Sequence, residues 1–109
     1  PAYSETEIYT GETFNGEKIY SKYFSGKTPD NETSFIDLTI GAEKLINITG
    51  YVLSTTNVQS PFIRQMGAYL TTGNLRIPKS GTAQYLDTDF EIVVFYTKPE
   101  TLTKKKKSK

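Results

Sequence analysis

The side chains that carry most enzyme chemistry are absent from this sequence. It contains no Cys and no His, so thiol nucleophiles, imidazole bases and thiolate or imidazole metal ligands are excluded. Asp87 and Asp89 stand two positions apart, and such a pair could supply oxygen ligands to Ca²⁺ or act as paired carboxylates. A solvated loop without metal is the simpler interpretation, because no residue pattern marks the apolar pocket that raises the pKa of a catalytic acid. The sequence therefore predicts a protein that is not an enzyme and that needs neither cofactor nor metal.

Two polar stretches contain residue types that bind sugars. These candidate ligand-binding residues are Asn57, Gln59, Arg64, Gln65, Gln84 and Tyr85. Amide and guanidinium groups beside an exposed aromatic ring suit the hydroxyls and the apolar face of a pyranose. The hypothesis is a shallow saccharide site built from Tyr85 with Gln84 or Arg64. The alternative for each residue is an ordinary loop position, and for Tyr85 it is burial as a lid on the core.

One stretch near the end of the chain predicts the strand around which the rest must be arranged. In the stretch from Asp89 to Pro99, apolar and aromatic residues alternate with residues of mixed polarity; the apolar set is Phe90, Ile92, Val94 and Tyr96. Alternation at period two, with β-branched and aromatic residues, indicates a strand packed on a core. The opposite parity carries Val93 and Phe95, which are too apolar for plain solvent exposure. We therefore expect a partner chain or a second sheet to cover these two residues.

Further strands are expected upstream, at intervals of about ten residues. The expected ranges are 1–10, 18–25, 35–40, 45–53, 62–70 and 75–77. Asn15-Gly16 and Gly73-Asn74 are typical of tight hairpin turns, because such turns need positive φ. In 45–53 we expect Ile46, Ile48 and Val52 to point inward, and Gly50 to mark a bulge or a close backbone approach. No segment has helical periodicity, so the prediction is a single antiparallel β-sandwich, jelly-roll or Ig-like, with seven to eight short strands.

Length and charge divide the chain into one domain and a tail. With 109 residues the chain is long enough for one core. We expect a β-sandwich over 1–103 and a disordered basic segment over 104–109. Five of the 13 basic residues fall in that segment, which leaves eight basic against 12 acidic residues in 1–103. An acidic body without a basic aromatic face argues against nucleic acid as a partner, and the lack of a long apolar run argues against membrane insertion.

Four pieces of the sequence resemble a module of phage and prophage tail-fibre and other minor structural proteins. They are Tyr3–Glu7 (YSETE), Gly11–Lys22 (GETFNGEKIYSK), Leu45–Tyr51 (LINITGY) and Phe95–Lys98 (FYTK). Their order and spacing follow that module over nearly the whole chain. Phe14 stands where the module often has a Trp, and the Lys-rich end is also a departure.

The resemblance implies a β-sandwich on the virion, commonly a homotrimer, that contacts host cell-surface saccharide. The expected partners are therefore further copies of the chain, other virion proteins and a host saccharide, and the expected location is a virion assembled in the host cytoplasm. A head-decoration or fibre-connecting domain without receptor binding is one alternative. A cellular carbohydrate-binding or adhesin-like β-sandwich is another.

Overall fold

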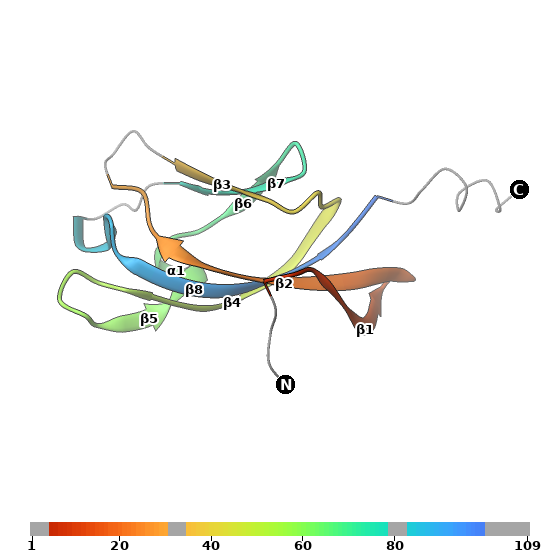
Figure 1. Ribbon diagram of the computed structural model, residues 1–109, viewed down its shortest axis with the longest axis horizontal. Coiled ribbons are helices and arrows are strands. Elements are labelled where there is room, and N and C mark those ends of the chain that lie inside the picture. The colour runs from red at the N-terminus through yellow and green to blue at the C-terminus, as the bar shows by residue number, and fades with distance from the viewer. Residues whose placement is uncertain (1–4, 31–34, 79–82, 100–109) are drawn as a thin grey trace, which may run out of the picture.

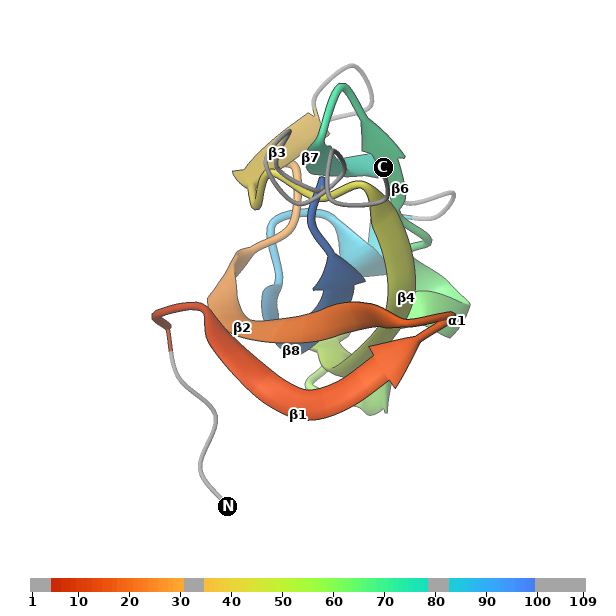
Figure 2. The ribbon, with the colours of Figure 1, turned by 90° about the vertical axis from the view of Figure 1, so that its right-hand side faces the viewer.

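The protein is a β-sandwich made of two antiparallel sheets (Figures 1 and 2). The computed structural model describes residues 5–30, 35–78 and 83–99. The expected basic segment 104–109 and the first residues of the expected strand 1–10 lie outside these ranges. The elements are β1 (Ile8–Phe14), β2 (Glu17–Lys27), β3 (Phe35–Thr39), β4 (Lys44–Leu53), β5 (Gln59–Pro61), α1 (Phe62–Gln65), β6 (Tyr69–Thr71), β7 (Asn74–Pro78), the 3₁₀ turn η1 (Ala83–Tyr85) and β8 (Asp89–Thr97).

The strand predicted most strongly from the sequence is the centre of the larger sheet. This five-stranded sheet, the large sheet below, has the order β1-β2-β8-β4-β5, and the three-stranded small sheet has the order β3-β7-β6. β8 pairs with β2 on one side and with β4 on the other. Because both edges of β8 are paired, its backbone groups are satisfied within the sheet, and its two faces are free to serve different purposes.

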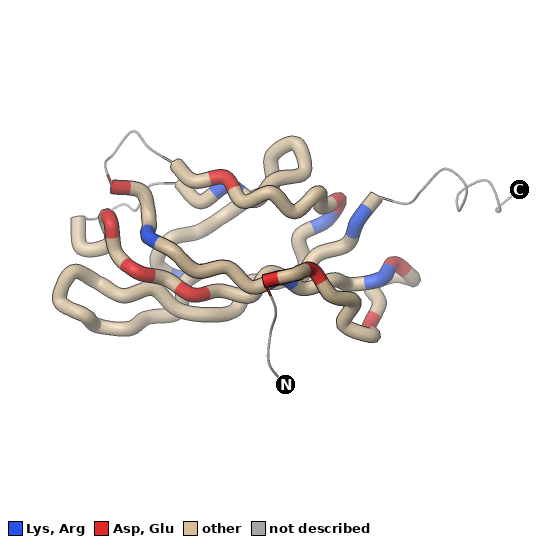
Figure 3. Tube along the Cα trace, viewed as in Figure 1, with Lys and Arg blue, Asp and Glu red and all other residues tan. Residues whose placement is uncertain are grey.

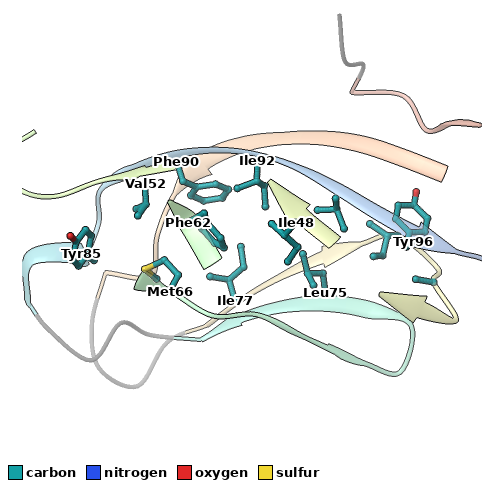
Figure 4. Close-up of a cluster of buried hydrophobic side chains, with 13 residues drawn as sticks. Ile48, Val52, Phe62, Met66, Leu75, Ile77, Tyr85, Phe90, Ile92 and Tyr96 are labelled. Carbon is teal, nitrogen blue, oxygen red and sulfur yellow. The ribbon is translucent and has the colours of Figure 1, made fainter. Parts of the chain in front are cut away.

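The core lies between the two sheets and uses the predicted parity of β8. Phe90, Ile92, Val94 and Tyr96 are each at most 3% exposed and belong to one cluster of buried side chains. Leu75 and Ile77 meet them from the small sheet. Figure 4 shows the cluster as a row, with Tyr85 near one end and Tyr96 near the other. The β-sandwich prediction is confirmed.

Both predicted hairpins form. Asn15 (φ 50) and Gly16 (φ 83) connect β1 to β2, and Thr72 (φ 48) and Gly73 (φ 85) connect β6 to β7. The second turn therefore falls one residue earlier than Gly73-Asn74. Two consecutive positive φ values match the right-handed twist of paired strands, which is why short polar residues and Gly occupy these positions.

The expected strand 62–70 is wrong over its first half. Phe62–Gln65 forms the short helix α1, and only Tyr69–Thr71 is a strand. Phe62 and Met66 are both buried, at 0% and 5% exposed, while Ile63 between them is 48% exposed. This is the spacing of one helical turn, i and i+4, and the Met66 amide donates to the Phe62 carbonyl at 2.8 Å. The apolar residues of this segment have period four, which a period-two interpretation misses.

Gly50 lets β4 and β8 approach closely. A Cβ built on Gly50, whose φ is +124°, would lie 2.1 Å from the carbonyl oxygen of Glu91. The predicted close approach is therefore present, and the pairing of β4 with β8 runs through Gly50 without interruption. The bulge of this strand lies instead between Leu45 and Asn47. Leu45 packs on the core there, whereas the expected inward residue Ile46 is in the bulge and is only half-buried.

Candidate functional site

The predicted ligand-binding residues are divided between two short segments of the fold. Asn57 (φ 64) and Gln59 are exposed at the turn that leads into β5. Arg64 is exposed and Gln65 half-buried on α1, the helical turn that follows. Gln84 is exposed on η1, and its carbonyl accepts a hydrogen bond from the Thr55 amide at 2.8 Å. This bond joins η1 to the turn after β4.

Tyr85 does not fit the role that the hypothesis gave it. Its side chain is 8% exposed and belongs to the core cluster between the sheets. The Thr28 hydroxyl donates to the Tyr85 carbonyl at 2.7 Å, which fixes the turn from the other side. Tyr85 is therefore a lid on the core, the alternative left open by the sequence, and its ring is not available to a sugar.

A different aromatic residue, Tyr51 of β4, stands at the centre of the hollowed surface. Three shallow hollows meet at its ring on the outer face of the large sheet, which is the face away from the small sheet. One, of about 270 Å³, lies toward Tyr23 and Glu91. A second, of about 340 Å³, lies toward Gln59 and Pro61. We call these three hollows, together with a fourth that continues them past Lys27, the Tyr51 groove.

Cross-strand register explains why these residues gather. Ser25 of β2 is paired with Glu91 of β8, and Glu91 is paired with Tyr51 of β4. Directly paired residues point to the same side of a sheet, about 5 Å apart. The next row on this face joins Tyr23 to Val93. The groove is therefore a property of the sheet face and does not depend on loop conformation.

The Tyr51 side chain is held in place by a carboxylate. Its hydroxyl donates a hydrogen bond to Oε2 of Glu91 at 2.8 Å. This bond to Glu91 raises the pKa of the Tyr51 hydroxyl, and desolvation of the hydroxyl adds to the effect. The ring therefore stays neutral and oriented, with Glu91 Oε1 left as an acceptor on its rim.

The groove continues to the end of the sandwich along charged residues. A third hollow, of about 320 Å³, runs from Tyr51 to Lys27 and Asp89, which form an ion pair at 2.9 Å. Both partners of this pair are well exposed, so it contributes little to stability. A fourth hollow then reaches Asn57 and Asp87. Two of the predicted residues, Asn57 and Gln59, thus line the hollows, whereas Arg64 and Gln84 are not among the residues that line these four.

Val93 and Phe95 lie on the same outer face. Val93 is 7% exposed and Phe95 is half-buried, and neither belongs to the core cluster between the sheets. The small sheet covers the opposite face, so the neighbours of Val93 come from the large sheet itself, Tyr23 and Thr49 being its paired residues. That a partner chain covers this end of the face stays a prediction.

The groups that border the groove have the chemistry needed to contact a saccharide. Within the described ranges, no group of three or more Asp and Glu residues could hold a metal ion. The groove instead combines an ordered aromatic ring with carboxylate, amide and hydroxyl groups around it. The ring can contact the apolar face of a sugar, and the polar groups can bind its hydroxyls.

The sequence contained a signal for Tyr51 that a search of loops could not find. Ile48 and Val52 have the inward parity of β4, so Tyr51 has the outward parity. An aromatic residue on the solvent face of a central part of a sheet is worth attention as a binding residue.

In the part of the chain that the structure describes, no helix has the length and apolar character needed to cross a membrane.

Comparisons with protein-family models, with curated proteins and with solved structures find no match.

Proposed function

We propose that this chain is a receptor-binding module of a phage tail fibre or baseplate, and that it contacts host cell-surface saccharide through the Tyr51 groove. The observation that carries the proposal is the open hollow around Tyr51, bordered by Glu91 and Gln59. An aromatic ring with acceptors at its rim suits a neutral sugar of a polymer that lies along an open face. The resemblance to tail-fibre modules supports the virion as the location.

The proposal includes a homotrimer, which must leave the groove open. Phe95 and Glu91 lie four residues apart on β8, which corresponds to about 13 Å along a strand. A contact between subunits over Phe95 therefore leaves the Tyr51 and Glu91 end of the face accessible. Light scattering tests this part: a stable monomer at micromolar concentration would refute the trimer.

The saccharide site is tested by replacing the aromatic ring. A glycan array of bacterial surface polysaccharides identifies a ligand for the full chain, and binding is then compared for Tyr51→Ala and Tyr51→Phe. Loss of the ring should weaken binding about tenfold or more, whereas Tyr51→Phe keeps the stacking surface and should cost less. Tyr69→Ala is the matched control, since Tyr69 is 48% exposed but lies on the small sheet.

The outcomes separate the site from the function. If Tyr51→Ala and the control bind as the unaltered chain does, the groove is not the site. If no polysaccharide binds and the isolated protein does not block phage adsorption, the receptor-binding function itself fails, and a structural role on the virion is favoured.

A further inference from the structure

A second surface, with a local excess of lysines, lies at the other end of the large sheet, on its inner face. The β1–β2 hairpin reaches beyond the small sheet, so this part of the inner face is not covered by it (Figures 1 and 2). The uncovered part carries the exposed residues Tyr9, Lys18 and Lys98 and the half-buried residues Tyr20 and Lys22, which together we call the tyrosine–lysine shelf. Tyr9 is 45% exposed, and Lys18 and Lys98 are exposed.

Packing joins four of these side chains into one surface, whereas the Lys22 ammonium lies beside it, 5.4 Å from the centre of the Phe24 ring. Tyr9 is paired with Tyr20, and their ring centroids are 5.9 Å apart. The Lys18 ammonium lies 5.1 Å from the centre of the Tyr9 ring, and the Lys98 ammonium lies 5.2 Å from that of Tyr20. Such cation–π contacts hold flexible lysines close to the sheet while leaving their N–H donors free for a ligand.

The lysines of the shelf are incompletely neutralised. Lys98 forms an ion pair with Glu7 at 2.7 Å. Among the described residues, no carboxylate forms an ion pair with Lys18 or Lys22. Burial raises the pKa of the Glu7 carboxyl group, and the hydrogen bonds from Lys98 and Tyr96 lower it. Lys22 is close enough to Glu7 to add a smaller lowering effect. The shelf thus has more ammonium groups than carboxylates.

The local balance of charge differs between the Tyr51 groove and the tyrosine–lysine shelf. Carboxylates gather along the Tyr51 groove at Asp87, Asp89 and Glu91, with Lys27 as the one cation among the residues that line its four hollows. Toward the end where β8 finishes, basic and acidic segments are interleaved (Figure 3), so the excess of ammonium groups is local to the face that carries the shelf. An acidic ligand is therefore disfavoured by the carboxylates of the groove and favoured by the local ammonium groups of the shelf.

We propose that the tyrosine–lysine shelf is a second binding site, specific for acidic saccharides that carry carboxylate or phosphate groups. The apolar edge of a sugar ring contacts Tyr9, and its anionic group accepts hydrogen bonds from the Lys18 ammonium. A neighbouring acidic sugar of the same polymer reaches Lys22. A nucleic acid fits less well, since the tilted Tyr9 and Tyr20 rings, 51° apart, offer no parallel surface for successive bases, and Glu7 interrupts the basic track.

The test compares charged and uncharged forms of one saccharide on the full chain. Calorimetry at low salt measures binding of hexagalacturonate and of its methyl ester, which has the same rings without the charges. The acid should bind at least tenfold more tightly than the ester, and its affinity should fall as salt rises. A phosphorylated mannose oligosaccharide, used in parallel, distinguishes phosphate from carboxylate as the preferred group.

Variants locate the site. Lys18→Gln and Lys22→Gln should each weaken binding of the acid about fivefold. Arg64→Gln removes one positive charge on α1 and is the matched control. A further variant replaces the four lysines at 104–107 with Gln, because the sequence adds these charges shortly after Lys98.

Three results would overturn the proposal. They are equal binding of acid and ester, loss of binding confined to the 104–107 variant, and tighter binding of a thymidine oligonucleotide of equal charge. The third result would assign the shelf to nucleic acid instead.

Discussion

Glu7 joins the start of the described chain to the end of β8, and we predict that it is the most important carboxylate for stability. Its carboxylate accepts a hydrogen bond from the buried Tyr96 hydroxyl and another from the Lys98 ammonium at 2.7 Å. Its side chain is 26% exposed, so water screens the interaction only in part. Burial would raise the Glu7 pKa, but these two hydrogen bonds outweigh it and the pKa is lowered.

Because Glu7 has two partners, Tyr96 and Lys98, the free-energy cost of removing its side chain can be divided between the lost charge and the lost hydrogen bonds. A hydrogen bond to a charged group contributes about 1.5 to 3 kcal/mol when it is well shielded. Glu7→Gln keeps an acceptor for Tyr96 but loses the charge, so we expect a loss of about 1 kcal/mol. Glu7→Ala also leaves the Tyr96 hydroxyl without an acceptor, so we expect a total loss of about 2 to 3 kcal/mol. At roughly 4 °C per kcal/mol, the Tm of Glu7→Ala should fall by about 10 °C.

The contribution of Glu7 to folding stability depends on pH with a definite sign. Because the folded-state pKa of Glu7 is lowered from the ordinary value of 4.5, its stabilising effect is present above that value. The effect is lost as pH falls from 4.5 through the folded-state pKa. The stability difference between the unaltered chain and Glu7→Gln should therefore be full at pH 7 and should shrink below pH 4.5.

Urea unfolding at several pH values measures these quantities, with a double-mutant cycle of Glu7→Ala and Tyr96→Phe. The two losses should be strongly non-additive, because removal of the Tyr96 hydroxyl also removes the group that Glu7 satisfies. Strictly additive losses, or a difference from Glu7→Gln that stays constant down to pH 3, would refute the assignment.

Three further substitutions test other parts of the fold. Gly50→Ala places a methyl group 2.1 Å from the Glu91 carbonyl oxygen, so it should lower the free energy of unfolding in urea by more than about 3 kcal/mol or abolish folding. Gly26→Ala is the control: its nearest atoms are at 3.8 Å, so it should cost about 1 kcal/mol or less. Equal costs would show that β4 and β8 can separate freely. The Thr97 hydroxyl is buried and finds no partner among the described residues, so Thr97→Val should leave the Tm unchanged or raise it, and a drop of several degrees would indicate a missed partner. Phe95→Ser should either unfold the monomer or dissociate the oligomer in light scattering, and a variant unchanged in both respects would show that this face is simply solvated.

The parts of the fold that depend on local chemistry were predictable from the sequence. The alternation of Phe90, Ile92, Val94 and Tyr96 specified the inner face of β8, and Asn15-Gly16 specified a hairpin, because both signals act over a few residues. Strand order, the assignment of each strand to one of the two sheets and the small size of the second sheet could not be predicted, since they depend on long-range pairing.

The candidate site was harder to predict than the fold. A residue such as Tyr85 has the same local character whether it covers the core or faces solvent, and only tertiary packing decides between the two. The exposure of Asn57 and Gln59 was predictable, because it follows from their polar surroundings. The hollows around Tyr51 could not be predicted from loop composition, because they lie on a sheet face and depend on the pairing of β2, β8 and β4.

The bulge in β4 is what allows one strand to contribute to both the core and the groove. Leu45 is paired with Tyr96, and Asn47 is already paired with Phe95, so one extra residue of β4 lies between these pairs. Before the bulge the odd-numbered residues of β4 share the inner parity of Tyr96, and after it they share the outer parity of Phe95. Without this switch, a β4 that began with Leu45 inward would place Tyr51 in the core and would turn its even-numbered apolar residues toward solvent. The outward position of Tyr51 therefore depends on the bulge, which lies about five residues away from the ring that it orients.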